Sequence, residues 1–187
     1  MKIAISGTHS TGKTTFLEEL KKQVSSQFKI QVVRGTAHEA MTLGFPILKN
    51  HTFQSTLWMM SAGMKAETEL EFKNGIIFVD RPVMEPLAYY RAALKSRNEV
   101  INAADEECLL GIARSFLGTY RMVIKTIVDP GVPISDNKKR DHDAAFRNSA
   151  DIEIDRLYEE LGMKPARLEI GNRNVLVEAA ALVRAAF

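Results

Sequence analysis

The chain has 187 residues, a formal net charge of +2 and a hydrophobic content of 45%. This length predicts one domain with a sizeable buried core. Its single cysteine excludes an intrachain disulfide framework and a cysteine-rich zinc site, and the mildly basic balance suits an anionic small molecule without demanding or excluding nucleic acid.

From the N-terminus, the pattern predicts a strand at 3–6, a helix at 14–25 and a strand at 30–33. A long helix follows at 51–72, then a strand at 76–79 and helices at 85–95 and 103–117. The chain continues with a strand at 122–128, a helix that begins at Asp141 or Asp143 and ends before Gly162, a strand at 166–170 and a helix at 174–186. Cys108 falls in the helix at 103–117, where we expect it to be buried in the core.

Short apolar strands separated by helices are typical of an α/β fold whose parallel sheet is covered by helices on both faces. Ligands of such sheets bind at the carboxyl ends of the strands, so we expect the loops after residues 6, 33, 79, 128 and 170 to meet at one crevice. No apolar run approaches the roughly 20 residues of a membrane span, and only a short apolar stretch precedes the first polar loop. We therefore expect a cytoplasmic protein with no leader and no membrane partner.

The strongest motif is GTHSTGKT, Gly7 to Thr14, which matches the spacing G-x-x-x-x-G-K-[S/T] of a phosphate-binding loop. Its backbone N–H groups would face an anion, Lys13 would reach the β- and γ-phosphates, and Thr14 would bind Mg²⁺. ATP and Mg²⁺ are thus the predicted cofactors. The predicted nucleotide-binding residues are Gly7, Thr8, His9, Ser10, Thr11, Gly12, Lys13, Thr14 and Thr15, and His9 among them occupies a variable position and is expected to be a spacer.

A second polar cluster follows the strand at 76–79. Asp80 ends a buried strand, where a carboxylate needs a cation, so we expect it to bind Mg²⁺; it is also a candidate base toward a substrate hydroxyl. Arg81 offers a guanidinium suited to phosphate oxygens, and the alternative is a structural ion pair. Two interpretations of Glu85 stay open: it binds or deprotonates the acceptor, or it favours the N-terminus of the next helix. Tyr89 either lines the acceptor pocket or packs in the core.

The loop after the second strand should face the acceptor. Arg34 is a candidate for holding an acceptor phosphate and Glu39 for holding a sugar hydroxyl. We expect His38, His51 and His142 to be ordinary surface histidines.

A basic segment after the fourth strand predicts a lid. Lys138, Lys139, Arg140 and Arg147 lie within residues 135–147 and would stabilise the charge on a migrating phosphoryl group while the lid excludes water. The alternative is a solvated run of charges before a helix. Beyond the fifth strand, Arg173 is the candidate neighbour of an adenine base, since a guanidinium stacks on aromatic rings.

Together these segments resemble the P-loop nucleoside and nucleotide kinase group, and most of all the AAA-labelled ATPase/kinase-like domains that are related to nicotinamide ribose kinase and found in many phages. The resemblance spans nearly the whole chain and rests on GTHSTGKTT, VVRGTAHEA, WMMSAGMKAETE, VDRPVMEPLAYY and DNKKRDHDAAFR. It implies a single P-loop domain over residues 1–187, with three layers, a five-stranded parallel sheet of order 2-3-1-4-5 and a small lid at about residues 131–148.

The resemblance also implies roles for individual residues. It places an arginine at Arg140, the predicted charge stabiliser, and an acidic residue at Glu67. Glu67 therefore joins the substrate candidates, with a place on a solvated helix face as the alternative. The group usually has an acidic residue where this chain has Arg34, and it tends to have aspartate where this chain has Glu85. These departures concern the identity of the substrate more than phosphoryl transfer.

The function that fits best is an ATP- and Mg²⁺-dependent kinase, a monomer or homodimer, acting on a nucleoside, a nucleotide or a related small acceptor. Its catalytic residues would be Lys13, Asp80, Arg81 and Arg140. One alternative is a kinase that acts on a modified base or an end of DNA. It would work in the host cytoplasm if a phage encodes it. Basic residues would then hold the DNA phosphates, among them Arg91, Lys95 and Arg97. The other is an NTP hydrolase used as a switch or motor. Two features disfavour it: the strand ends in Asp80-Arg81, and the chain lacks an N-K-x-D motif with the correct spacing.

Overall fold

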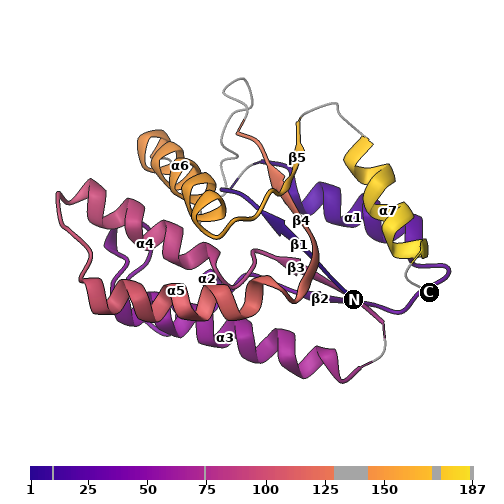
Figure 1. The fold of residues 1–187 in the computed structure, drawn as a ribbon, viewed down its shortest axis with the longest axis horizontal. Helices are drawn as coiled ribbons and strands as arrows, with labels where there is room; N and C mark the ends of the chain where they lie inside the picture. The colour runs from indigo at the N-terminus through magenta and orange to yellow at the C-terminus, as the bar shows by residue number, and fades with distance from the viewer. Residues whose placement is uncertain (10, 74, 129–142, 170–173, 186–187) are drawn as a thin grey trace.

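The computed structural model describes residues 1–9, 11–73, 75–128, 143–169 and 174–185 (Figure 1). Across these residues, five strands form one parallel sheet in the order β2-β3-β1-β4-β5. The strands are β1 (Lys2–Ser6), β2 (Ile30–Val33), β3 (Ile76–Asp80), β4 (Tyr120–Thr126) and β5 (Ala166–Leu168). The parallel sheet and its strand order confirm the predicted fold class.

Helices connect these strands and cover the sheet. They are α1 (Lys13–Val24), α2 (Ala37–Thr42), α3 (Phe53–Glu71), α4 (Glu85–Ser96), α5 (Ala103–Leu117), α6 (Ala144–Glu160) and α7 (Asn174–Ala185), with a short 3₁₀ turn, η1 (Leu48–Asn50), before α3. The predicted helices and strands are all present, with ends that differ by a few residues. The sequence pattern missed α2 and η1.

Two apolar cores lie on opposite faces of the sheet because successive strand residues point to opposite sides. In β1, Ile3 and Ile5 belong to the core formed with α1 and α7, whereas Ala4 belongs to the core formed with α3, α4, α5 and α6. Figure 1 shows the same three layers, with α1 and α7 on one side of the strands. This packing fixes the carboxyl ends of the strands, where a ligand would bind.

Local capping explains where several helices begin. Thr52 and Ser55 form a reciprocal capping box at the start of α3, and the Asn102 side chain accepts hydrogen bonds at the start of α5. At α6, the Asp143 carboxylate accepts a hydrogen bond from the Phe146 N–H at 2.8 Å, so Asp143 is the N-cap of this helix. Gly162, with a φ of 68°, follows the end of α6 in the left-handed conformation that glycine favours.

Two expectations about side-chain burial were wrong. Cys108 lies in α5 as predicted but is exposed, because Leu109, Leu110 and Ala113 take the inward face of that helix. His51 is not a surface residue: it is 2% exposed and its Nδ1 pairs with the Leu48 carbonyl at 2.8 Å. Burial lowers the pKa of His51 to about 4, against an opposing effect of that hydrogen bond.

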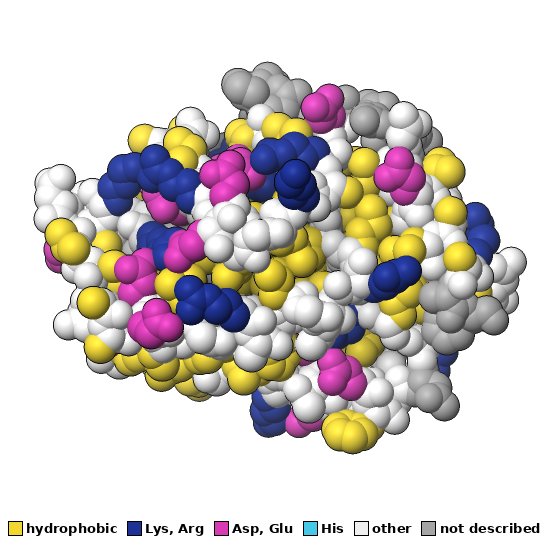
Figure 2. Space-filling model, in the orientation of Figure 1, with side chains coloured by type: hydrophobic (Ala, Val, Ile, Leu, Met, Phe, Trp, Pro, Cys, Tyr) yellow, Lys and Arg dark blue, Asp and Glu magenta, His cyan; other side chains and the backbone are white. Residues whose placement is uncertain are grey.

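On the face that Figure 2 shows, positive and negative side chains alternate over α4, α5 and α6. Arg91 pairs with Glu106 at 2.6 Å and with Glu160 at 2.7 Å, and Lys95 lies 3.8 Å from Glu153. These pairs neutralise much of the positive charge on this face. Among the described helices, none is long and apolar enough to cross a bilayer.

Candidate active site

The phosphate-binding loop joins β1 to α1 and is braced by β4. Gly7 has a φ of 128°, and a Cβ at this position would overlap the Thr126 hydroxyl and lie 3.0 Å from the Thr126 carbonyl oxygen. The Thr126 hydroxyl donates to the Ser6 carbonyl at 3.0 Å and also pairs with the Thr11 hydroxyl. Only glycine fits this close approach, so the strand end of β4 sets the shape of the loop.

The loop leads directly into α1, whose N-terminus can face an anion. Gly12 adopts a left-handed conformation with a φ of 82°, and α1 begins at Lys13. The Lys13 ammonium is buried and donates to the Thr8 carbonyl within the loop. The loop thus places a cation and a helix N-terminus at the same point, which is the chemistry that a phosphate group requires.

Glu85 ties this loop to α4. Its Oε2 accepts hydrogen bonds from the Ser6 hydroxyl at 2.8 Å and from the Gly7 N–H at 3.0 Å, while its Oε1 accepts from the Arg81 guanidinium. The side chain is almost fully buried. Because both carboxylate oxygens already accept hydrogen bonds, the geometry favours a positioning role for Glu85 over proton transfer.

Asp80 and Arg81 stand at the carboxyl end of β3. The Asp80 Oδ1 is buried and makes no hydrogen bond to any described residue, which is costly for a carboxylate unless a cation binds there. Arg81 adopts a φ of 75°, a strained conformation for a residue with a side chain. Its guanidinium bonds to Glu85 and, at 3.1 Å, to the Tyr89 hydroxyl, which holds it in place.

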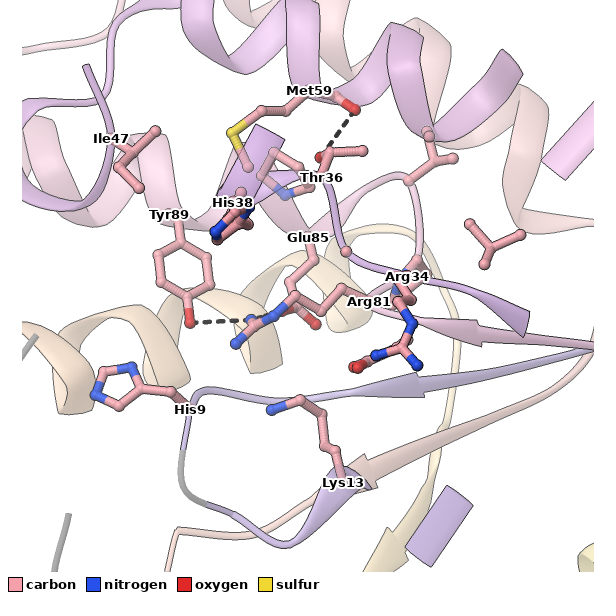
Figure 3. Close-up of a pocket in the computed structure, with 18 of the residues that line it drawn as sticks. His9, Lys13, Arg34, Thr36, His38, Ile47, Met59, Arg81, Glu85 and Tyr89 are labelled. Carbon is pink, nitrogen blue, oxygen red and sulfur yellow. Dashed lines mark hydrogen bonds and ion pairs between the residues drawn. The ribbon is translucent and has the colours of Figure 1, made fainter. Parts of the chain in front are cut away.

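These groups line one cavity of about 490 Å³ (Figure 3). Figure 3 shows Lys13 on one side of it, Thr36 and Met59 on the opposite side, and Arg81 between them. The phosphate-binding loop forms one half. The other half, called the acceptor chamber from here on, is lined by Val33, Arg34, Gly35, Thr36, Ala37, His38, Met41, Ile47, Leu48, His51, Met59, Gly63, Val83, Pro86 and Tyr89.

The structure brings most of the predicted site residues together. Those that line the cavity are His9, Thr11, Gly12, Lys13, Thr14, Thr15, Arg34, Asp80, Arg81, Glu85 and Tyr89. Gly7 and Thr8 lie buried at the base of the loop, and Glu39 is exposed on α2 away from the cavity lining. Ser10, Arg140 and Arg173 lie outside the described residues, as do residues 131–142 of the predicted lid, so their roles stay predictions.

Glu67 lies elsewhere, in a buried network between α3, β1 and β4. Its carboxylate pairs with the Lys2 ammonium at 3.1 Å and accepts a hydrogen bond from the Tyr120 hydroxyl at 2.8 Å. The Tyr120 oxygen in turn accepts from the Val83 N–H at 3.1 Å. Burial raises the pKa of Glu67, although Tyr120 and Lys2 oppose the effect. In this position Glu67 supports the β3–α4 connection through Tyr120, and it does not belong to the described cavity lining.

Thr126 was missed at the sequence level, whereas Arg147 was predicted as one of the positive charges of the lid. Thr126 braces the loop, and the polar pair Lys125-Thr126 at the end of an otherwise apolar strand was the available signal. Arg147 is 4% exposed on α6, yet its Nε makes no hydrogen bond to a described residue. It lies one turn before Asp151, which pairs with Lys125 at 3.0 Å, so it stands near the carboxyl end of β4.

The donors at the site fit a magnesium ion held jointly with phosphates. Within the described residues, no group of three or more His, Cys, Asp or Glu side chains could hold a metal alone. Mg²⁺ typically takes one or two protein oxygens and completes its shell with water and phosphate oxygens. The unpartnered Asp80 Oδ1 and the exposed Thr14 side chain beside the loop provide that kind of donor set.

Comparisons with known proteins identify the family and agree with the fold. A family model described as an AAA domain matches residues 2–174. Among solved structures, deoxyadenosine kinase from M. mycoides is similar in a form described as holding the products dCMP and a flexible dCDP. The similarity covers 100% of this chain and 98% of that one, with a TM-score of 0.62 and 18% identity. A form of that enzyme with bound dCTP gives a TM-score of 0.65 at 16% identity, with both chains covered completely.

The NadR protein, solved in complex with NR, is also similar, with a TM-score of 0.68 and 16% identity over 98% of this chain but only 51% of that one. No curated protein matches. At these identities the structural likeness establishes the fold alone. The family model, which covers most of the chain, confirms the family-level resemblance expected from the sequence.

Proposed function

This chain belongs to the AAA domain family, and from its cavity we propose that it is a phosphotransferase that uses ATP and Mg²⁺. The γ-phosphoryl group would pass to a small nucleoside, nucleotide or related acceptor. The observation that carries the proposal is one continuous cavity, with a phosphate-binding loop on one side and an acceptor chamber on the other. A switch or motor needs the loop but has no use for a second chamber that faces it.

Four residues at the loop side have roles in this proposal: Lys13, Thr14, Asp80 and Arg81. Lys13, now bonded to the Thr8 carbonyl, would turn to the β- and γ-phosphates, and the backbone N–H groups of the loop would hold the same oxygens. Thr14 and Asp80 would hold Mg²⁺, which neutralises charge on the phosphates when bound. Arg81 is held by Glu85 and Tyr89 at the junction of the two halves, where it would orient the transferring group.

The acceptor chamber suits a flat organic ring. Met59, Ile47 and Leu48 supply apolar surface, and Tyr89 adds an aromatic face. Such a lining with few polar groups is typical of pockets for small molecules. Several basic residues that a DNA substrate would need are already engaged, since Arg91 and Lys95 pair with carboxylates on the surface of the molecule. The small acceptor is therefore the function we propose.

The proposal is tested by incubating the protein with γ-labelled ATP and Mg²⁺ against nucleosides, nucleoside monophosphates, nicotinamide riboside, and DNA with hydroxymethylated bases. We expect label on one class of small acceptor. Label on DNA alone would favour the DNA kinase. Label on none of them, with ATP hydrolysis that no acceptor stimulates, would contradict both kinase functions.

A substitution at Asp80 tests the role of the strand-end carboxylate. Asp80→Asn keeps the shape of the side chain but removes the charge that would hold Mg²⁺, so we expect the transfer rate to fall by at least about 100-fold while ATP still binds. Initial rates and equilibrium binding of ATP measure the two effects. Transfer that survives in Asp80→Asn would show that this carboxylate is not the metal ligand.

A further inference from the structure

Given the proposed phosphotransferase function, we propose that the acceptor is a phosphomonoester, namely a nucleoside monophosphate, and that Arg34 binds its phosphate. The reaction would convert the monophosphate into a diphosphate. An oxygen of the acceptor phosphate forms a bond to the γ-phosphorus of ATP, the bond from that phosphorus to the β,γ-bridging oxygen breaks, and ADP leaves.

The positive charges near the acceptor chamber are only partly neutralised. At the junction of the chamber with the phosphate-binding loop, Arg81 pairs with Glu85. Arg34 lines the same chamber, is exposed, and forms no ion pair with any carboxylate in the part of the chain that the structure describes. Glu39, the nearest acidic residue along the chain, is exposed on α2 and does not line the cavity. The chamber thus presents a cation that a neutral nucleoside leaves unpaired and a phosphate dianion satisfies.

Arg34 also lies beside Asp80 and Arg81 at the carboxyl ends of the strands. β2 pairs with β3 in register, Val33 opposite Val79, so Arg34 follows its strand at the level where Asp80 ends the neighbouring one. A Cβ on Gly35 would lie 3.0 Å from the Arg81 Cδ and 3.3 Å from the Asp80 carbonyl oxygen. The Arg34-Gly35 turn therefore packs directly against Asp80-Arg81. Figure 3 shows Arg34 on the side of the cavity that also holds Arg81, between Lys13 and Thr36.

A hydroxyl acceptor and a phosphate acceptor differ in their need for a catalytic base. A hydroxyl acceptor must lose its proton during transfer and needs a base, whereas a phosphate oxygen is already ionised near pH 7. Both oxygens of Glu85 accept hydrogen bonds from the loop and from Arg81, which favours a positioning role for that carboxylate. Asp80 is the remaining carboxylate in the described lining, and it is the one that fits the metal. A described lining with no further carboxylate suits an acceptor that needs no base.

The test compares matched pairs of each common deoxynucleoside and its 5′-monophosphate, with γ-labelled ATP and Mg²⁺, in the wild type and in Arg34→Gln. We expect kcat/KM to be higher for the monophosphates. In Arg34→Gln, the KM for the monophosphate should rise about 10- to 100-fold, the loss expected for hydrogen bonds between charged groups, while the KM for ATP stays unchanged. Arg34→Lys should recover part of the loss. Arg121→Gln, which removes an exposed arginine from the opposite end of β4, serves as the matched control and should change neither constant.

Three other outcomes would overturn the inference, and each shows which part of it is wrong. Nucleosides phosphorylated as fast as monophosphates, with no effect of Arg34→Gln, would leave the kinase function standing and remove the phosphate site. An Arg34→Gln variant whose KM for ATP rises as much as that for the acceptor would assign Arg34 to the donor side. No transfer to either class would overturn the proposed function and this inference with it.

Discussion

His51 shows how one buried side chain makes stability depend on pH. Its ring is nearly inaccessible and neutral, and the Arg97 guanidinium donates to its backbone carbonyl at 3.1 Å, which disfavours a second positive charge. The pKa of His51 falls from 6.5 to about 4 on folding, so its contribution is complete above pH 6.5 and is lost as the pH falls toward 4. The loss should be on the order of 3 kcal/mol in the free energy of unfolding.

Urea titrations at a series of pH values measure this effect. His51→Asn keeps a donor for the Leu48 carbonyl but cannot titrate, so its stability should fall less than that of the wild type between pH 6.5 and 4. His38→Asn removes an exposed histidine and should keep the wild-type slope. Equal slopes in His51→Asn and the wild type would show that another group dominates this range.

Arg147 is a buried cation on α6. Its Nε makes no hydrogen bond to a described residue, and burying a charge carries a desolvation cost that its remaining contacts must offset. We expect Arg147→Met, which keeps a long side chain, to raise the free energy of unfolding by about 1–2 kcal/mol without ligand and to slow phosphoryl transfer at least about 10-fold. Denaturant titration and initial rates provide the two readings. A less stable variant with full activity would mean that Arg147 serves only the packing of α6.

The helices and strands were predicted more accurately than the burial and contacts of single side chains. Each strand is a short apolar run between polar segments, so β2 was predicted to the residue and β3 within one. The six residues of α2 and the three of η1 are too few to show a helical period, and they were missed although they help line the acceptor chamber. The burial of His51 and the network around Glu67 depend on contacts between segments far apart in the chain, which no local pattern contains.

The turn between β1 and α1 gives a test at the level of an element. Gly7→Ala would place a methyl group against the Thr126 hydroxyl at a φ that alanine avoids, so we expect it to lower the free energy of unfolding by about 2–4 kcal/mol and to abolish ATP binding. Gly111→Ala is the matched control, because Gly111 lies inside α5 with nothing within 4 Å of an added Cβ. It should raise stability by about 0.5–1 kcal/mol. Full ATP binding by Gly7→Ala would show that the loop tolerates another shape.

At the scale of the whole molecule, the phosphate-binding loop connects the two cores. β1 contributes Ile3 and Ile5 to one core and Ala4 to the other, and the loop leaves β1 toward α1 on one face while Glu85 holds it to α4 on the other. A ligand on this loop therefore binds a structure that exists only when both layers are packed. Because ATP should have no affinity for the unfolded chain, its binding energy adds to the stability of the entire domain.

Thermal unfolding with and without ATP and Mg²⁺ measures this coupling. At an ATP concentration about 100 times Kd, we expect about 2.7 kcal/mol of added stability, which raises the Tm of a chain of this size by about 5–10 °C. Thr14→Val keeps the shape of an exposed side chain and should retain the shift with ATP alone while losing the increment that Mg²⁺ adds. Lys13→Met should lose most of the shift in both conditions, since the ammonium would contact the β- and γ-phosphates. A full Mg²⁺ increment in Thr14→Val would remove Thr14 from the metal site and leave Asp80 as its only predicted protein ligand.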